Sequence, residues 1–390
     1  MVSQFLFAKT PSIVFGAHQF AKLPGLFQQV SKNVLLVTGG TSFRSKPNYD
    51  YLIQGAKEKD INLLEAQIAG EPTVEEIDKI CEEFRYRNIH LVCAIGGGSV
   101  LDAGKAISAM LPILESVENY LEGIGTKTHS GDKIPFYAVP TTSGTGSEAT
   151  KNAVISRVGE NGFKKSLRHD NFVPDLALVD PNLTLSCSPE ITASCGMDAI
   201  TQLIESYVST KAGSMTDALA LDGLYHAITS IKHAYFEPDR IQARSSMSYA
   251  ALMSGICLTN AGLGTVHGFA SSIGGMFQIP HGVVCGTLLP ACIDYTIKRI
   301  IEQDPEDDSL RKFADIAMLF GDVEYTEDID LCKSLVENMY AWVEGFKIPT
   351  LSHYGIGEND FDKIVEMTDN KNNPFALDKN DLKAILKIRL

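Results

Sequence analysis

Apolar positions in the first half of the chain fall into short runs that are separated by amphipathic stretches. Five of these runs are expected to be strands, at residues 33–38, 61–68, 90–96, 134–140 and 175–180. One intervening stretch repeats apolar residues at helical spacing, namely Val74, Ile77, Ile80, Cys81 and Phe84. Strands that are apolar throughout and alternate with helices are typical of a parallel sheet covered on both faces. We therefore predict an α/β domain over residues 1–185.

The pattern changes after about residue 185, where long segments with helical periodicity replace the short apolar runs. Ser188, Pro189 and Glu190 form a predicted helix start, because serine caps a helix and proline suits its first position. Few alternating β-like runs follow. We predict an all-α second domain over residues 186–390, with the boundary in the segment 179–186.

Composition narrows the class of protein. The 390 residues are 44% hydrophobic and 21% charged, which is ordinary for a globular protein of two domains. The net charge of −14 would repel nucleic acids and anionic membranes, so neither is expected as a partner. The eight cysteines form no CxxC pair, and we find no signal peptide and no apolar stretch of transmembrane length. These features favour a cytoplasmic protein.

A glycine-rich turn, GGGSVLDAGK, follows the strand at 90–96 and opens a helix. Glycines at 96–98 allow the backbone to approach a diphosphate, which the N-terminal amides of the helix can bind. Gly97, Gly98 and Ser99 are candidate contacts, although the turn matches neither the P-loop nor GxGxxG. Asp102 lies one helical turn further and either faces the ligand or is solvated. A tight turn that binds no ligand is the alternative.

Two further segments suit a dinucleotide. The loop at 140–150 concentrates hydroxyls that can donate to phosphate or to a nicotinamide amide. The candidates are Thr141, Thr142, Thr145 and Ser147. A helix-capping loop would use the same residue types. The first strand ends at Gly39, Gly40 and Ser42, where an acid would bind ribose and repel a 2′-phosphate. The chain has no acid there and offers Arg44 and Lys46, so NADP is favoured over NAD unless these cations are merely solvated.

A candidate metal site lies in the helical half, at Asp198, Gln202, His267 and His281. Asp198 and Gln202 are four apart and share one helix face. A lone histidine beside glycines is usually a core residue, but two of them with an aspartate favour a metal site. Imidazole and carboxylate suit Zn, Fe, Ni or Mn, and three protein ligands suffice for a catalytic metal.

Taken together, these segments resemble the iron-containing (group III) alcohol dehydrogenase family. The resemblance runs through SIVFGAH, GEPTVEEI, GGGSVLDAGK, PTTSGTGSEAT, PDLALVDP, GMDAITQLIESYVS, AGLGTVHG and IPHG. It implies a Rossmann-like dinucleotide-binding domain, a helical domain, one divalent metal (iron or zinc) in the cleft, and a homodimer built partly by N-terminal strand pairing. The family's metal ligands fall on Asp198, position 202, His267 and His281. Its cofactor contacts fall on Gly97, Gly98, Ser99, Thr141, Thr142, Thr145 and Lys164, and Gly39 at its selector position favours NADP.

The chain departs from the family pattern at two positions. Gln202 stands where the commonest pattern has histidine, and Ser271 stands where many members carry a further histidine. Three arrangements follow: Gln202 is a weak ligand, the other three residues hold the metal with water, or the site is metal-free. The expected activity is metal-dependent, NAD(P)-linked alcohol oxidation or aldehyde reduction, with Asp198, His267 and His281 as catalytic residues. A dehydroquinate synthase-like cyclase and a non-catalytic nucleotide-binding protein are the alternatives.

Overall fold

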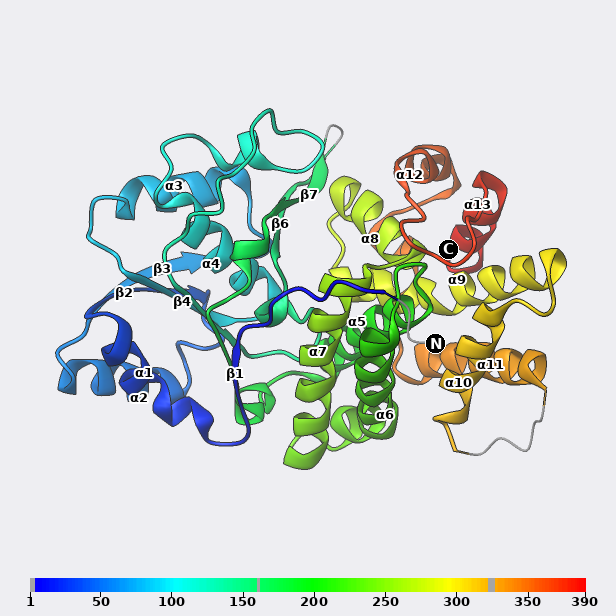
Figure 1. Ribbon diagram of the computed structural model, residues 1–390, viewed down its shortest axis with the longest axis horizontal. Coiled ribbons are helices and arrows are strands. Elements are labelled where there is room, and N and C mark those ends of the chain that lie inside the picture. Colours follow the sequence, from blue (N-terminus) through cyan, green and yellow to red (C-terminus); the bar gives the residue numbers. More distant parts are fainter. Residues whose placement is uncertain (1–3, 160–161, 322–326) are drawn as a thin grey trace.

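The computed structural model describes residues 4–159, 162–321 and 327–390. Figure 1 shows an α/β lobe that holds the N-terminal half and a helical lobe that holds the rest. Six parallel strands form one sheet in the order β1-β8-β5-β4-β2-β3. Their bounds are β1 Ser12–Phe15, β2 Asn33–Gly39, β3 Asn62–Ile68, β4 Leu91–Gly96, β5 Phe136–Pro140 and β8 Leu176–Val179. The predicted parallel sheet and its five strands are confirmed.

Both faces of the sheet are covered, which explains why its strands are apolar throughout. One face packs on α1 (Leu23–Val30) and α2 (Pro47–Glu58), and the other on α3 (Val74–Phe84) and α4 (Gly98–Met110). The predicted apolar positions of α3 are all buried. Its N-cap Thr73 accepts a hydrogen bond from the amide of Glu76, which satisfies one of the free amides of the first turn.

Three strands were not predicted. β1 has only four residues and lies at the edge of the sheet, so its apolar run is too short to predict a strand. β6 (Asn152–Arg157) and β7 (Phe163–Arg168) form a separate antiparallel pair with alternating burial. Polar residues such as Lys164 and Lys165 interrupt β7, so the sequence there gives no continuous hydrophobic run.

The second lobe is helical, as predicted. α5 (Pro189–Val208) begins at Pro189, and Ser188 caps it by accepting from the amide of Ile191, so the predicted helix start is confirmed. The following helices are α6 Ser214–Phe236, α7 Ile241–Ala261, α8 Thr265–Met276, α9 His281–Gln303, α10 Asp308–Met318, α11 Asp328–Gly345, α12 Phe361–Met367 and α13 Lys379–Ile388.

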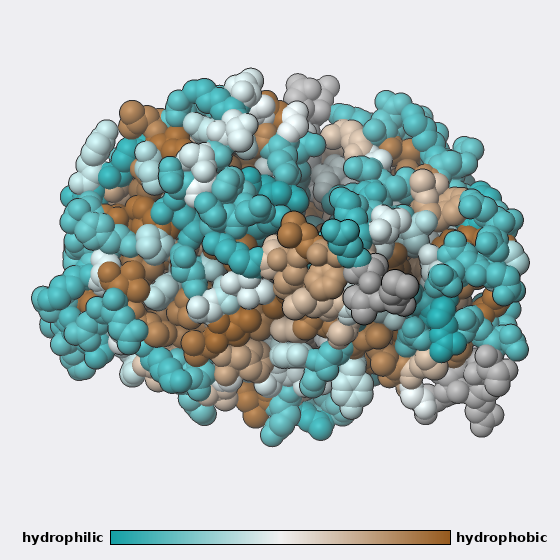
Figure 2. Space-filling view, viewed as in Figure 1, coloured by the Kyte–Doolittle hydropathy of each residue, from teal (hydrophilic) through white to brown (hydrophobic). Residues whose placement is uncertain are grey.

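A third hydrophobic core lies inside this helical lobe, and it also includes Ala177 and Val179 of β8. The two lobes therefore share buried contacts. Hydrophilic side chains cover most of the face shown in Figure 2, and hydrophobic ones gather toward its middle. Within the described residues no single helix has the length and apolarity to cross a membrane, whereas α7 and α8, bent by 98°, pass that test only as a pair.

Candidate active site

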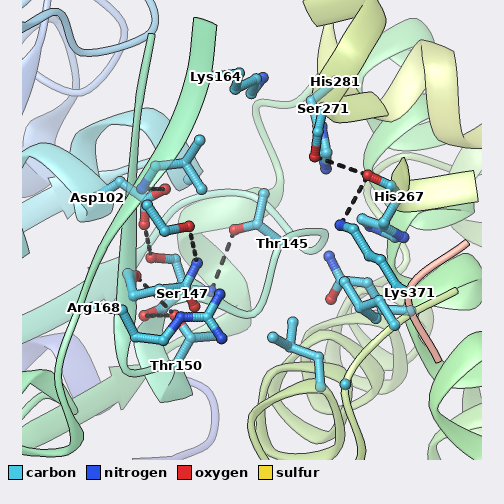
Figure 3. A pocket seen from close by; sticks show the side chains of 18 of the residues that line it. Asp102, Thr145, Ser147, Thr150, Lys164, Arg168, His267, Ser271, His281 and Lys371 are labelled. Atoms are coloured by element: carbon cyan, nitrogen blue, oxygen red, sulfur yellow. Dashed lines mark hydrogen bonds between the residues drawn. The ribbon is translucent and has the colours of Figure 1, made fainter. Parts of the chain in front are cut away.

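A cavity of about 530 Å³ separates two walls, one from each lobe. Figure 3 shows Asp102, Ser147 and Arg168 on the wall from the α/β lobe, with His267 and Lys371 opposite. The predicted site residues that line this cavity are Gly98, Ser99, Asp102, Thr145, Ser147, Lys164, Gln202, His267, Ser271 and His281. The nucleotide-type turn and the candidate metal residues, which are distant in sequence, therefore border one space.

The metal-type side chains meet where three helices converge. Asp198 is on α5, His267 on α8 and His281 at the first position of α9. The Oδ1 atom of Asp198 lies 3.4 Å from Nε2 of His267 and 3.6 Å from Nε2 of His281. Although burial alone would raise the pKa of Asp198, the two histidines lower it, so the carboxylate is ionised. The three side chains can therefore act on one cation.

A buried carboxylate fixes the orientation of His267. Oε2 of Glu205 lies 2.6 Å from Nδ1 of His267, and Oε1 of the same carboxylate accepts from the amide of Val266 at 2.7 Å. This contact leaves Nε2 of His267 facing Asp198. A carboxylate that binds the outer nitrogen of a metal-ligating histidine is the common support of such ligands. Glu205 was not among the predicted site residues, although it lies two helical turns after Asp198 on the same helix.

Protonation of the two histidines differs. Burial lowers the pKa of His281, so its imidazole is neutral. Burial opposes charge on His267 as well, but Cys285 and Glu205 beside it raise its pKa well above the ordinary value. A cation that binds there must displace a proton from His267. His281 Nδ1 is buried and has no hydrogen-bond partner among the described residues.

Gln202 is buried beside Asp198, but its carbonyl oxygen is directed elsewhere. Its Nε2 donates to Oδ1 of Asp198 at 3.2 Å, and its Oε1 accepts from Oγ of Ser254 at 2.7 Å. The amide therefore presents a donor to the carboxylate rather than an oxygen to a cation.

Cys285 occupies the remaining side of the cluster and was not among the predicted site residues. Its Sγ lies 3.7 Å from Nε2 of His267 and 3.7 Å from Nε2 of His281. One donor atom each from Asp198, His267, His281 and Cys285 lie within 4.8 Å of one another. The sequence contained a sign of this contact, because Cys285 follows His281 by four residues and shares its helix face. Carboxylate, imidazole and thiol donors fit a divalent transition metal.

Ser271 stands where many family members carry a further histidine, and its hydroxyl is already hydrogen-bonded. Its hydroxyl donates to the backbone oxygen of His267 at 2.9 Å, one turn back along α8. Lys371 donates from Nζ to the same oxygen, also at 2.9 Å. Both side chains support the helix that carries His267.

On the opposite wall, α4 begins at the glycine turn with Gly97 as its N-cap and no side-chain cap. A Cβ atom added to Gly98 would lie 2.5 Å from Cγ2 of Thr145, so this glycine allows the loop at 140–150 to approach closely. Gly39 lies beside Val100 of the same helix start, since an added Cβ there would be 3.5 Å from Cγ2 of Val100. The free amides of α4 therefore open next to the ends of β2 and β5.

Several predicted cofactor residues already have partners in the chain. Asp102 accepts from the amide of Val154 at 3.0 Å and from the hydroxyl of Ser147, which ties α4 to β6. Lys164 pairs with Glu71. Thr142 lines a smaller cavity with Cys187 and Cys195.

Nor do Thr141 and the basic residues after β2 face the main cavity. The amide of Thr141 donates to the oxygen of Gly96, between the ends of β4 and β5. Arg44 lies 2.6 Å from Glu65 and donates to Thr38, so this cation already has a carboxylate partner. Lys46 is exposed.

Comparisons with known proteins match both lobes. Residues 10–181 fit the model of the iron-containing alcohol dehydrogenase family, and residues 192–390 fit that of the C-terminal region of Fe-containing alcohol dehydrogenases. An NADPH-dependent butanol dehydrogenase of Clostridium saccharobutylicum is 32% identical over 91% of each chain. A long-chain-alcohol dehydrogenase of Geobacillus thermodenitrificans is 34% identical over 77% of this chain and 73% of its own. The crystal structure of a 1,3-propanediol oxidoreductase superposes over the full length of both chains with a TM-score of 0.89 and 28% identity.

Proposed function

The chain belongs to the iron-containing alcohol dehydrogenase family, and from this premise we propose that it moves a hydride between nicotinamide and a small alcohol or the matching carbonyl compound. One observation carries the proposal. His267 and His281, which cluster with Asp198, line the same cavity as Gly98 of the glycine turn. A hydride can pass directly only when both reactants occupy one space.

The residues divide the chemistry between the two walls. The open amides of α4 bind diphosphate, as helix N-termini do, and the loop at Thr145 closes on that turn. Opposite them, Asp198, His267 and His281 hold a divalent cation, with Glu205 fixing the ring of His267. When bound, the cation polarises the substrate oxygen. The nicotinamide supplies or accepts the hydride.

We propose NADP rather than NAD as the dinucleotide. β2 ends in Gly39 and Gly40 without an acid that would repel a 2′-phosphate. The butanol dehydrogenase relative is NADPH-dependent. Because Arg44 is paired with Glu65, the exposed Lys46 is the better candidate to meet the phosphate. A higher kcat/KM with NADP than with NAD supports this assignment, and the reverse ratio contradicts it.

The proposed function is tested with purified protein, a panel of short alcohols and aldehydes, and both dinucleotides. Treatment with a chelator should abolish turnover, and divalent metal should restore it. His267→Ala should lower kcat/KM by about 100-fold or more, because charge on the substrate oxygen is then poorly stabilised. The exposed His353→Ala is the matched control and should leave the rate unchanged. Full activity after complete removal of metal contradicts the proposal.

We further propose that the protein is a homodimer formed through β1. This strand is the edge of the sheet and pairs only with β8 among the described strands. Ser12 and Gly16 donate to Asp175 and Val179 of that neighbouring segment. By alternation, the amides of Ile13 and Phe15 face away from β8, toward a possible second strand.

A further inference from the structure

We propose that Cys285, rather than Gln202, provides the fourth protein ligand of the cation site, so that one carboxylate oxygen, two imidazole nitrogens and one sulfur bind the metal. This inference rests on the proposed metal-dependent function. It adds to that function the identity of a ligand and, through it, the class of metal.

Four of the six distances among the four donor atoms match those of a tetrahedral site, and the other two are within 4.8 Å. With metal bonds of about 2.3 Å to sulfur and about 2.0–2.2 Å to nitrogen and oxygen, the edges of a tetrahedron are about 3.6 Å from sulfur to nitrogen and about 3.3–3.5 Å from oxygen to nitrogen. The observed sulfur–nitrogen separations are both 3.7 Å. The oxygen–nitrogen separations are 3.4 and 3.6 Å. A cation therefore fits between these atoms with little movement.

Helix geometry aims the thiol at this point. His281 opens α9 and Cys285 lies one turn further on the same face, so both side chains reach Asp198 and His267 together. Cys285 is fully buried. Cys292, also buried on α9, lies outside the cluster. Position on the helix, rather than burial alone, distinguishes Cys285.

The side chain of Gln202 is already hydrogen-bonded at both ends. Its oxygen is occupied by Ser254 and its nitrogen donates to Asp198, so it orients the carboxylate instead of binding the cation. Thiolate is a softer donor than an imidazole or an amide oxygen, and it favours zinc over hard cations. Fe²⁺ also lies low in the general order of affinity for divalent metals. The site is therefore expected to prefer Zn²⁺ to Fe²⁺.

The test uses cobalt as a spectroscopic probe in the full-length protein. The protein is stripped of metal, reconstituted with Co²⁺, and examined for the near-ultraviolet charge-transfer absorption that a cobalt–thiolate bond produces. We expect this band in the wild type and its loss in Cys285→Ser. Zinc affinity, measured by competition with a chromophoric chelator, should fall by more than about 10-fold in Cys285→Ser, the lower bound for loss of even a supporting residue.

Two controls make the result specific. Cys292→Ser removes a buried thiol from the same helix and should retain the band. Gln202→Ala should retain it as well, with a small change in cobalt binding. Circular dichroism and thermal melting of each variant identify a failure to fold, and Cys285→Ala provides a second, apolar replacement if the serine is not tolerated.

The possible failures are distinguishable. Stoichiometric cobalt binding without a charge-transfer band, or a band that survives in both Cys285 variants, overturns the ligand assignment and leaves the metal-dependent function intact. Absence of cobalt binding in the wild type contradicts the proposed function itself, and the ligand assignment with it.

Discussion

At the scale of single residues, Glu205 determines how His267 is presented. Its two oxygens hold Nδ1 of His267 and the amide of Val266, both at the buried start of α8. Replacing it with glutamine puts an amide group against one of these two donors and removes the negative charge. Glu205→Gln should therefore weaken zinc binding by about 10- to 100-fold, which equilibrium dialysis can measure.

The control for that change is Glu237→Gln. Glu237 also accepts from a histidine nitrogen, His233, at 2.7 Å, but this pair is exposed and lies outside the metal cluster. Zinc affinity should be unaffected. Equal affinities in Glu205→Gln and the wild type would show that the orientation of His267 does not depend on the carboxylate.

A second residue makes stability depend on pH. Glu148 is buried in the loop after β5, and burial raises its pKa from 4.5 to about 7. Between these values the folded protein holds a proton that the unfolded chain releases, so stability falls as pH rises through this window. Glu148→Gln, which has no charge to bury, should melt at a higher temperature than the wild type at about pH 8 and at a similar temperature at about pH 4.5.

Thermal melting across this range measures the effect directly. The exposed Glu83→Gln is the control and should reproduce the pH profile of the wild type. Identical profiles for Glu148→Gln and the wild type would mean that burial of this carboxyl group costs no stability.

Residue type and spacing were enough to propose Asp198, His267 and His281, and the structure gathers these three. Residue type and spacing did not predict Cys285 or Glu205, because cysteines in apolar segments and glutamates in helices are common. Their role in a site depends on which side chains lie beside them in the fold. Likewise, the sequence shows the charge of Arg44, which follows β2, but not its partner Glu65, which lies on β3. Side-chain pairing across elements depends on tertiary packing, which local patterns do not encode.

At the scale of elements, the contact of α4 with the sheet depends on the absence of a side chain. A Cβ added to Gly104 would lie 2.5 Å from Cβ of Ala94 on β4 and 2.9 Å from the ring of Phe136 on β5. Gly104→Ala should therefore push α4 away from the strands and destabilise the protein by about 1–3 kcal/mol. The thermal midpoint measures the change, and cofactor KM should rise because α4 carries the glycine turn.

Gly25 offers a matched helical glycine in α1. An added Cβ there would meet nothing within 4 Å. Gly25→Ala should stabilise the protein by about 0.5–1 kcal/mol, since alanine loses less backbone entropy than glycine on folding. Equal thermal shifts for the two variants would contradict the packing explanation for Gly104.

Helices and strands were predictable where the pattern of apolar residues is clear. The strands that lie between other strands are continuous apolar runs, and α3 shows a clear helical period. The β6–β7 pair was missed because its residues alternate and because Lys164 faces the cavity, where it pairs with Glu71. Its position depends on contacts with α4 and α8 rather than on its own periodicity.

At the scale of the whole molecule, the open edge at β1 predicts how two copies would associate. Ile13→Pro removes an amide that faces away from β8 and leaves the bonds of Ser12 and Gly16 in place. Light scattering should show a dimer for the wild type and a monomer for Ile13→Pro. Ile13→Ala keeps the amide and should remain dimeric, and a dimeric proline variant would place the interface elsewhere.

The four side chains of the metal-type cluster come from α5, α8 and α9, whereas the glycine turn opens α4 across the cavity. On the proposed function, loss of the cation should leave the dinucleotide wall assembled. A batch of this protein that shows no turnover but still retains dinucleotide on a column is best treated as lacking its ion, and resupplying divalent metal is a better first remedy than refolding.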